Sequence, residues 1–186
     1  MKIISLISTL TLLSLTLQAE EVNIKKEGVP YIKMLGKELK TNLITKMKED
    51  PSGLSAMGFC TGKAEELTQE INAKLPKGTS VRRTALKTRS TKNAPDEVDI
   101  SVMNAYQEKA LAKTLDPKDI VVVGKDDTHR IYKPLIIADA CLKCHGDADK
   151  ISPQIKSVID KNYPKDLATG VKKGDFRGVI VSEIMK

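Results

Sequence analysis

The feature that most constrains this chain is the pentapeptide Cys141-Leu142-Lys143-Cys144-His145. The spacing Cys-x-x-Cys-His is the attachment sequence of a c-type haem, in which the two thiols bond to the haem and the histidine ligates the iron. A structural zinc site needs four Cys or His ligands, and the whole chain has 3 Cys and 2 His. A thioredoxin-like redox pair belongs near the start of a βαβ unit, whereas this motif lies near the end of the chain. We therefore predict one haem c, attached covalently to Cys141 and Cys144, with His145 as an iron ligand.

Residues 1–19 have the pattern of a secretory signal peptide. Lys2 precedes an apolar run that extends from Ile3 to Leu17, and Ala19 is a small residue at the expected cleavage point. The run of about 15 residues is shorter than the roughly 20 that a membrane-spanning helix needs. We expect export to the periplasm, where c-type haem is attached, and no stable membrane insertion after cleavage. Residues 20–186 then form a single domain.

The net charge of +7 does not indicate a nucleic-acid-binding protein. Lysines alternate with acidic residues along the chain, and aromatic residues make up only 3% of it. A nucleic-acid binder concentrates its basic side chains and interleaves stacking groups. We therefore expect no nucleic-acid partner, although the charge suits weak attraction to an acidic protein. The scarcity of aromatic side chains also suggests that a buried porphyrin fills part of the core.

Apolar residues at steps of three and four predict two N-terminal helices. The first covers residues 30–48 and has Pro30 in its first turn. The second covers residues 54–75, where Met57 and Cys60 belong to one apolar stripe. Cys60 is therefore expected to point toward the core.

The third cysteine has two interpretations. A free cysteine is commonly a small buried hydrophobe. An odd cysteine in an exported protein is also a candidate for a specific role, and a thiolate can ligate haem iron on the second axial side. Met57 and His129 compete with Cys60 for that position, and the residue pattern leaves the choice open.

The middle of the chain combines a basic strand with a capped helix. Residues 81–88 alternate imperfectly between apolar and polar and predict a strand. Residues 93–96 predict a turn that caps a helix over residues 97–113. The basic side chains here are either a solvated strand face or partners for the haem propionates, which suit the fork of an arginine. This basic cluster consists of Arg82, Arg83, Lys87 and Arg89.

Strands dominate the segment that leads to the haem motif. Residues 120–123 and 129–137 flank a turn and predict a β-hairpin that delivers Cys141. Pro134 implies a sheet edge or a bulge at its position. A short helix over residues 153–161 and a final strand over residues 175–184 complete the predicted domain.

The order of motifs resembles a known family. Cys60 on an early helix is followed by the segments 83–89, 93–96, 132–135 and 141–146. This order is similar to that of exported c-type haem domains with a PAS-like fold, which are often fused to histidine kinases or chemotaxis receptors and also occur as stand-alone secreted proteins. The resemblance implies an α+β fold with a PAS-like antiparallel sheet, N-terminal helices and flanking helices. It also implies a haem held between His145 and Cys60, and it adds Tyr132 to the residues expected to contact the cofactor.

Two functions are compatible with these features. The first is a periplasmic redox or gas sensor with a six-coordinate haem, which would bind NO or CO and act on a periplasmic signalling or redox protein. The alternative is a periplasmic electron-transfer cytochrome c, for which a methionine ligand such as Met57 is better suited because a thioether raises the reduction potential. We expect no enzyme activity, because two filled axial positions leave no site for a substrate on the iron.

Overall fold

The computed structural model describes the backbone of residues 5–186 and the side chains of residues 21–186. The predicted signal peptide, residues 1–19, therefore lies outside the described side chains. Among the described residues, no helix combines the length and the apolar character that crossing a membrane requires. The helices are α1 (Ser5–Glu49), α2 (Leu54–Gly58), α3 (Ala64–Asn72), α4 (Glu97–Leu111), α5 (Leu142–His145) and α6 (Pro153–Asn162), and the strands are β1 (Thr79–Thr84), β2 (Val121–Lys125), β3 (Thr128–Ile136) and β4 (Phe176–Met185).

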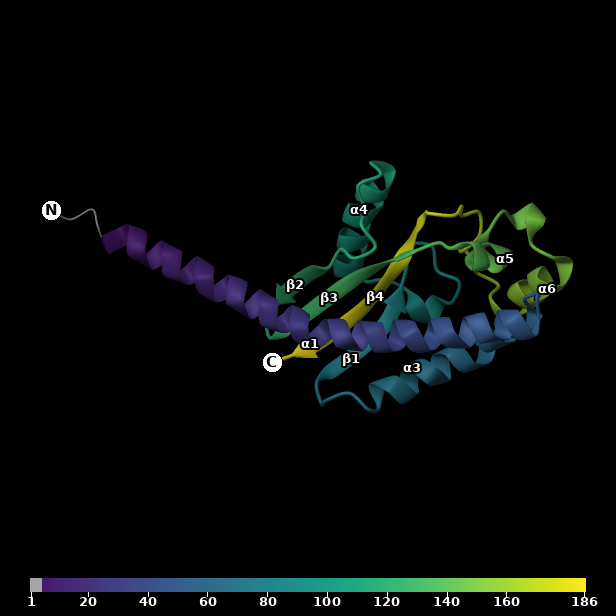
Figure 1. The fold of residues 1–186 in the computed structure, drawn as a ribbon, viewed down its shortest axis with the longest axis horizontal. Helices are drawn as coiled ribbons and strands as arrows, with labels where there is room; N and C mark the ends of the chain where they lie inside the picture. Colours follow the sequence, from purple (N-terminus) through teal and green to yellow (C-terminus); the bar gives the residue numbers. More distant parts are fainter. Residues whose placement is uncertain (1–4) are drawn as a thin grey trace.

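The strands form one antiparallel sheet in the order β1-β4-β3-β2. α1 runs across one face of this sheet with α3 beside it, and α4 packs on the other face (Figure 1). α5 and α6 gather at the end of the sheet that lies opposite the C-terminus. This arrangement confirms the predicted α+β class, with a PAS-like antiparallel sheet, N-terminal helices and flanking helices.

The two faces of the sheet follow from the alternation of side chains along each strand. On β4, Ile180 and Ile184 are buried against α1, whereas Val179 and Val181 are buried against α4. β4 lies between β1 and β3 and carries apolar residues on both faces, so the last strand of the chain forms the centre of the core.

The first helix is longer than the sequence predicted. α1 contains Pro30 in its interior, so the expected helix start at this residue is wrong. Proline removes one helical hydrogen bond, but Ile24 and Ile32 on either side are both fully buried and continue one apolar face along the sheet. Gly28 allows the close approach, since a Cβ there would lie 2.6 Å from the Cδ1 atom of Ile131. Packing on the sheet therefore outweighs the local break.

The second predicted helix is divided by a π-helical turn. α2 ends at Gly58, the π-helix η1 (Phe59–Lys63) follows, and α3 continues from Ala64. Met57 and Ala64 are buried on either side of Cys60, and Cys60 itself lies in the π turn and packs against the core. Such single π turns occur frequently at functional sites.

The edge of β1 is covered by a side chain. The Asn72 amide nitrogen donates to the carbonyl of Val81 at 2.9 Å, and the Val81 amide donates to the Asn72 side-chain oxygen at 2.7 Å. Asn72 thus takes the place of a neighbouring strand at this point of the sheet.

The predicted β-hairpin is confirmed by β2 and β3. Pairing with β2 ends at Tyr132, whereas Pro134 is paired with Val179 of β4. From the residue after Tyr132 onward, β3 has a neighbouring strand on one side only, so Pro134 lies at an edge of the sheet. A register shift between β3 and β4 follows at Leu135 and Ile136. The expected edge and bulge near Pro134 are both present, because proline has no amide hydrogen to give to a second neighbour.

Candidate functional site

The segment from Cys141 to His145 lies where β3 leads out of the sheet. The 3-10 turn η3 (Asp139–Cys141) is followed directly by α5. Gly146 ends this helix, and its amide donates to the carbonyl of Leu142 at 2.9 Å. A Cβ at Gly146 would lie 2.5 Å from that carbonyl oxygen, so the turn requires glycine. The predicted delivery of the motif by the hairpin is confirmed.

The imidazole of His145 is held through one ring nitrogen. Its Nδ1 atom lies 2.7 Å from the carbonyl oxygen of Ala168, and the Val171 amide donates to the His145 carbonyl at 3.1 Å. A carbonyl only accepts, so Nδ1 carries the hydrogen and Nε2 keeps its lone pair. Burial, aided by the nearby cations Arg89 and Arg177, lowers the pKa of His145 to about 3. The ring is therefore neutral near pH 7 and has one nitrogen suited to a metal.

The three cysteines lie in one electrostatic neighbourhood. All are half-buried thiols without a disulfide. Burial raises the pKa of Cys60, an effect that Arg83 and Arg89 oppose and that Cys141 reinforces. Burial and the proximity of Cys60 likewise raise the pKa of Cys144. The structure therefore brings Cys60 to the motif, although no three Cys, His, Asp or Glu side chains among the described residues are arranged to hold a bare metal ion.

The two other candidates for the second axial position differ in their location. Met57 is 1% exposed and belongs to the apolar cluster of Ile155 and Ile159, against which Cys144 packs. His129 is the second residue of β3 and pairs with Ile184 near the C-terminus. At about 3.3 Å per residue, the strand places His129 roughly 20 Å or more before the motif. Met57 remains near the site, whereas the structure does not bring His129 together with the motif.

Adjacent arginines of β1 point to opposite faces of the sheet. Arg82 donates to both carboxylate oxygens of Asp99 on α4, at 3.0 and 2.8 Å. Arg83 faces the other way, toward Cys60 and Tyr163, and burial lowers the pKa of its guanidinium. Only Arg83 of this pair reaches the candidate site.

Arg89 is engaged by groups of the protein itself. Its guanidinium donates to the carboxylate of Asp166 at 3.1 and 3.2 Å and to the carbonyl of Cys144 at 2.6 Å. The side chain of Lys87 is exposed, and its backbone carbonyl accepts a hydrogen bond from Arg177 at 2.9 Å. The two predicted basic residues thus differ: the Arg89 side chain is held by protein groups within the site, whereas the Lys87 side chain is exposed.

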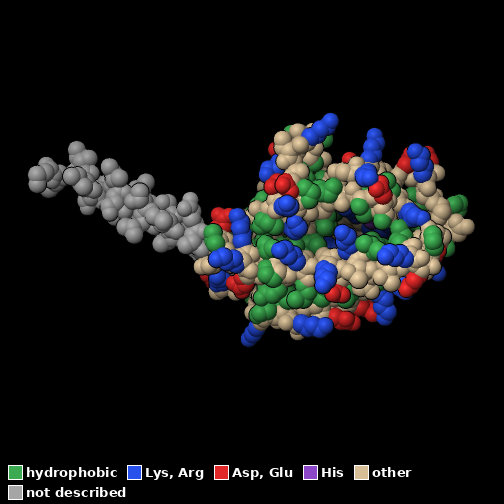
Figure 2. Space-filling view, in the orientation of Figure 1, with side chains coloured by type: hydrophobic (Ala, Val, Ile, Leu, Met, Phe, Trp, Pro, Cys, Tyr) green, Lys and Arg blue, Asp and Glu red, His purple; other side chains and the backbone are tan. Residues whose placement is uncertain are grey.

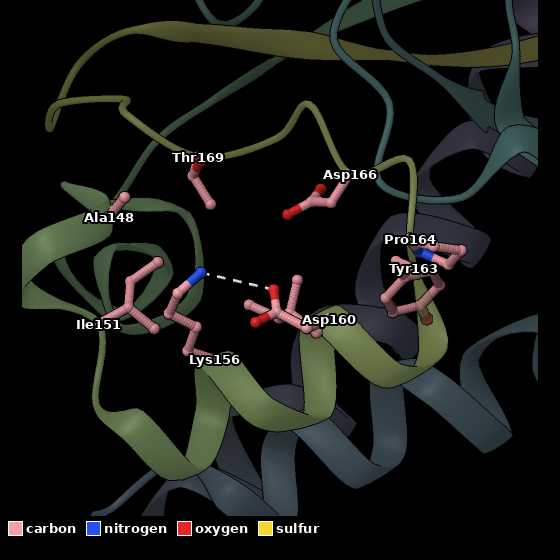
Figure 3. A pocket seen from close by; sticks show the side chains of 9 residues that line it. Ala148, Ile151, Lys156, Asp160, Tyr163, Pro164, Asp166 and Thr169 are labelled. Atoms are coloured by element: carbon pink, nitrogen blue, oxygen red, sulfur yellow. Dashed lines mark hydrogen bonds and ion pairs between the residues drawn. The ribbon is translucent and has the colours of Figure 1, made fainter.

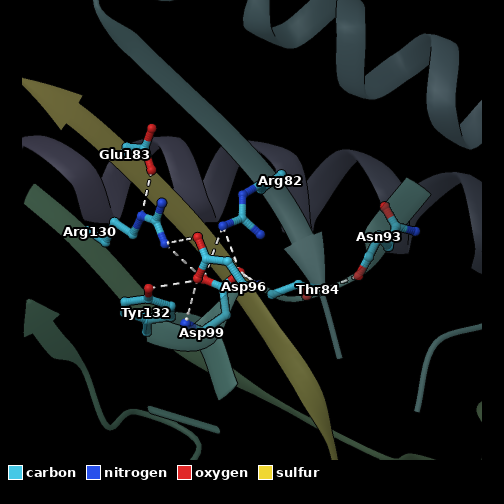
Figure 4. Close-up of polar contacts among 8 residues, drawn as sticks. All are labelled: Arg82, Thr84, Asn93, Asp96, Asp99, Arg130, Tyr132 and Glu183. Carbon is cyan, nitrogen blue, oxygen red and sulfur yellow. Dashed lines mark hydrogen bonds and ion pairs between the residues drawn. The ribbon is translucent and has the colours of Figure 1, made fainter. Parts of the chain in front are cut away.

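Tyr132 lies in a different cluster, on the α4 face of the sheet. Its hydroxyl donates to Asp99 at 3.0 Å, within a network that Figure 4 shows together with Arg82 and Arg130. Tyr132 and Asp99 are both fully buried there. The structure does not bring Tyr132 together with Cys60 or the motif, because neighbouring residues of β3 face opposite sides of the sheet.

A pocket of about 390 Å³ opens beside α6 (Figure 3). Tyr163 and Asp166 line it and connect it to the candidate site, whereas the three cysteines are not among its lining residues. Figure 2 also shows a recess on the face above α1, with hydrophobic and basic side chains around it. The remaining lining residues of the pocket are Ala148, Ile151, Lys156, Ile159, Asp160, Pro164 and Thr169.

Comparison with known proteins identifies the family. The family model described as Tll0287-like matches residues 12–184. The chain belongs to the Tll0287-like family. The fold of this Tll0287-like chain is similar to the crystal structure of the cyanobacterial heme-protein Tll0287, with a TM-score of 0.55 and 25% identity over 66% of this chain and 70% of that one. A comparison with curated proteins gave no match. The predicted resemblance to a family of haem-binding domains is confirmed.

Three site residues of this Tll0287-like domain were not predicted from the sequence. Asp166 pairs with Arg89, and the Tyr163 hydroxyl donates to the carbonyl of Cys60 at 3.2 Å. Arg177 lies near Arg83 and Arg89 at the start of β4. Arg177 could have been found from the alternation of side chains along β4. Phe176 is buried against α4, so the next residue, Arg177, is expected on the opposite face of the sheet. Asp166 and Tyr163 lie in a loop without periodicity, so their contacts depend on the tertiary fold.

Proposed function

We propose that this protein binds one haem c, attached covalently to Cys141 and Cys144, with His145 as the proximal iron ligand. The observation that carries the proposal is the contact between His145 Nδ1 and the Ala168 carbonyl, an arrangement typical of metal-ligating histidines. The fold similarity to the heme-protein Tll0287 supports the same class of cofactor. When bound, the haem supplies a one-electron redox centre whose potential depends on its axial ligands and surroundings.

The charges around the motif suit a ligand with carboxylates. Arg83 and Arg177 are partly buried cations, and burial lowers the pKa of both, to about 10 for Arg177. A buried cation is stabilised by an anionic partner that can accept its hydrogen bonds. We therefore retain Arg83 as a partner for a haem propionate and add Arg177. Arg89 is assigned to the protein framework, and the side chains of Lys87 and Tyr132 are left out.

We assign the second axial position to Cys60, which gives a six-coordinate iron. The thiol lies beside Cys141 and Cys144 and belongs to the π turn η1. Arg83 and Arg89 favour its thiolate form, in opposition to the effect of burial on the pKa. Met57 is the alternative ligand from the same helical region.

The ligand set favours a redox or diatomic-gas sensor over an enzyme. A thiolate stabilises the ferric state, and Cys60 lies on the π turn η1, which is separate from α1. That turn is a candidate for the element that responds to NO or CO and acts on a periplasmic redox or signalling protein. The proposal includes neither a nucleic-acid partner nor stable insertion into a membrane. The periplasmic location rests on the signal-like residues 1–19.

An electron-transfer cytochrome c is the second candidate, and it is favoured by the buried position of Met57 within the cluster that contacts Cys144. The two functions make different demands. A sensor should bind CO or NO in the ferrous form and exchange electrons slowly with small redox proteins. Rapid, reversible exchange with a periplasmic partner would favour the electron carrier.

The covalent attachment can be tested directly. Protein produced in the bacterial periplasm with c-type maturation is extracted with acidic acetone, and haem retained by the chain is measured as its pyridine haemochrome. We expect full retention in the natural sequence and in Cys60→Ala, and no retention in Cys141→Ala/Cys144→Ala. Haem that is extracted from the natural sequence would contradict the proposal.

A further inference from the structure

A chain of hydrogen bonds connects Arg89 to the proximal histidine. The Arg89 guanidinium donates to both oxygens of Asp166, and each of the two side chains is 10% exposed. Asp166 Oδ1 accepts a hydrogen bond from the Ala168 amide at 2.9 Å. The carbonyl of the same Ala168 accepts from His145 Nδ1 at 2.7 Å. One carboxylate therefore fixes the residue that holds the imidazole.

Two further contacts tie the same groups together. Arg89 also donates to the carbonyl of Cys144, the residue before His145. The Leu167 amide donates to the Thr88 carbonyl at 2.9 Å, next to Arg89. The arginine thus joins the loop after α6 to the haem-attachment helix by side-chain and backbone contacts.

We propose that Arg89 and Asp166 are positioning residues for His145, which orient its imidazole and set its strength as a ligand by fixing the Ala168 carbonyl. The inference rests on the proposed function, since His145 is taken as the iron ligand. It goes beyond it because neither residue is among the proposed iron ligands.

The physical basis is the hydrogen bond at Nδ1. A strong acceptor there makes the imidazole a better electron donor through Nε2 and fixes the rotation of the ring. Without Asp166 the Ala168 amide loses its acceptor, and the carbonyl on the same residue is free to turn away. Arg89 compensates the buried charge of Asp166, and its fork matches the carboxylate in a way that a lysine does not.

The decisive comparison is between Asp166→Asn and Asp166→Ala. Both substitutions remove the same charge, but only the asparagine offers an oxygen to the Ala168 amide. We expect the ferric EPR spectrum and the reduction potential of Asp166→Asn to remain closer to those of the natural sequence. Asp166→Ala should shift the potential upward and broaden the EPR signals. Equal changes in the two variants would overturn the positioning role and indicate only a charge effect.

Arg89→Lys provides a second variant if Asp166→Ala does not fold, since it keeps the charge and removes the fork. We expect a changed EPR spectrum here too, and an unchanged one contradicts the proposal. The control is Arg82→Lys, which changes another arginine–carboxylate contact, the one that a single guanidinium nitrogen of Arg82 makes with both oxygens of Asp99 on the other face of the sheet. It should lower stability without changing the spectrum or the potential.

A measurement without haem separates this inference from the proposed function. In the haem-free protein, ¹⁵N NMR reports which ring nitrogen of His145 carries the hydrogen. We expect the Nδ1–H tautomer in the natural sequence and in Asp166→Asn, and a mixture with the Nε2–H form in Asp166→Ala. A pure Nδ1–H form in all three would refute the positioning network, whatever haem the protein binds. Absence of covalent haem with the expected NMR result would instead refute the proposed function alone.

Discussion

The hydroxyl of Tyr163 donates a hydrogen bond to the backbone carbonyl of Cys60 at 3.2 Å, across 103 positions of sequence. It joins the end of α6 to the π turn that carries the candidate thiolate ligand. Replacement by phenylalanine, Tyr163→Phe, removes this bond and should lower the free energy of unfolding by about 1 kcal/mol. We also expect a changed ferric absorption spectrum, because the turn that presents Cys60 loses a contact.

Tyr106→Phe is the control for this variant. The Tyr106 hydroxyl donates to the Tyr132 carbonyl at 3.1 Å on the other face of the sheet. Its loss should reduce stability by a similar amount in urea unfolding and leave the spectrum as it was. Identical spectra for both variants and the natural sequence would show that Tyr163 has only a structural role.

Substitution of the two sulfur candidates distinguishes the second axial ligand. Cys60→Ala should abolish thiolate-type charge-transfer bands in the ferric protein, whereas Met57→Leu should retain them. The methionine change nearly conserves volume and should cost less than about 1.5 kcal/mol. If the spectrum responds to Met57→Leu and not to Cys60→Ala, the methionine is the ligand and the electron carrier becomes the better function.

The depressed pKa of His145 makes the haem-free protein sensitive to acid. Above the ordinary pKa of 6.5 the imidazole is neutral in both folded and unfolded chains and has no effect on their balance. Between pH 6.5 and about 3 the unfolded chain takes up a proton that the folded chain resists, so stability falls as the pH falls. The slope from this residue approaches about 1.4 kcal/mol per pH unit. Urea unfolding of the haem-free protein from pH 7 to 4 should show this loss, which His145→Gln should remove.

Gly178 should tolerate no side chain. Its φ of +150° is unfavourable for other residues, and a Cβ would lie 2.5 Å from the Thr84 carbonyl oxygen. We expect Gly178→Ala to lower the free energy of unfolding by about 2–4 kcal/mol. Gly58 at the end of α2 has open space around its Cβ position, so Gly58→Ala should raise stability by up to about 1 kcal/mol. Similar thermal midpoints for the two variants would contradict this assignment.

Much of the fold was predictable because local signals agree with the packing. Asp96 caps α4 and forms a capping box with Asp99, as the turn at residues 93–96 suggested. α6 and β4 also lie close to the segments predicted for them. Pro30 is the exception, since a long apolar face on the sheet overrides a residue that disfavours helix interiors. The π turn at Cys60 has no sequence signal of its own.

Only the part of the site that is contiguous in sequence, the Cys-x-x-Cys-His motif, could be predicted. The spacing of Cys141, Cys144 and His145 is a local pattern, so the sequence alone is sufficient to identify the motif. Arg89 was expected to bind the cofactor, but in the structure its guanidinium donates to the carboxylate of Asp166, a residue 77 positions away. No periodicity relates two such residues. The acceptor for His145 is a backbone carbonyl, which any residue type could supply.

The side chain of Asn72 has a consequence for how this protein meets other chains. An exposed edge strand is a template for strand pairing between molecules, which leads to aggregation. At β1 the amide of Asn72 already occupies both backbone groups of Val81. A foreign strand that paired with β1 at Val81 would first have to break these two hydrogen bonds, so a single amide side chain opposes self-association at the middle of this edge.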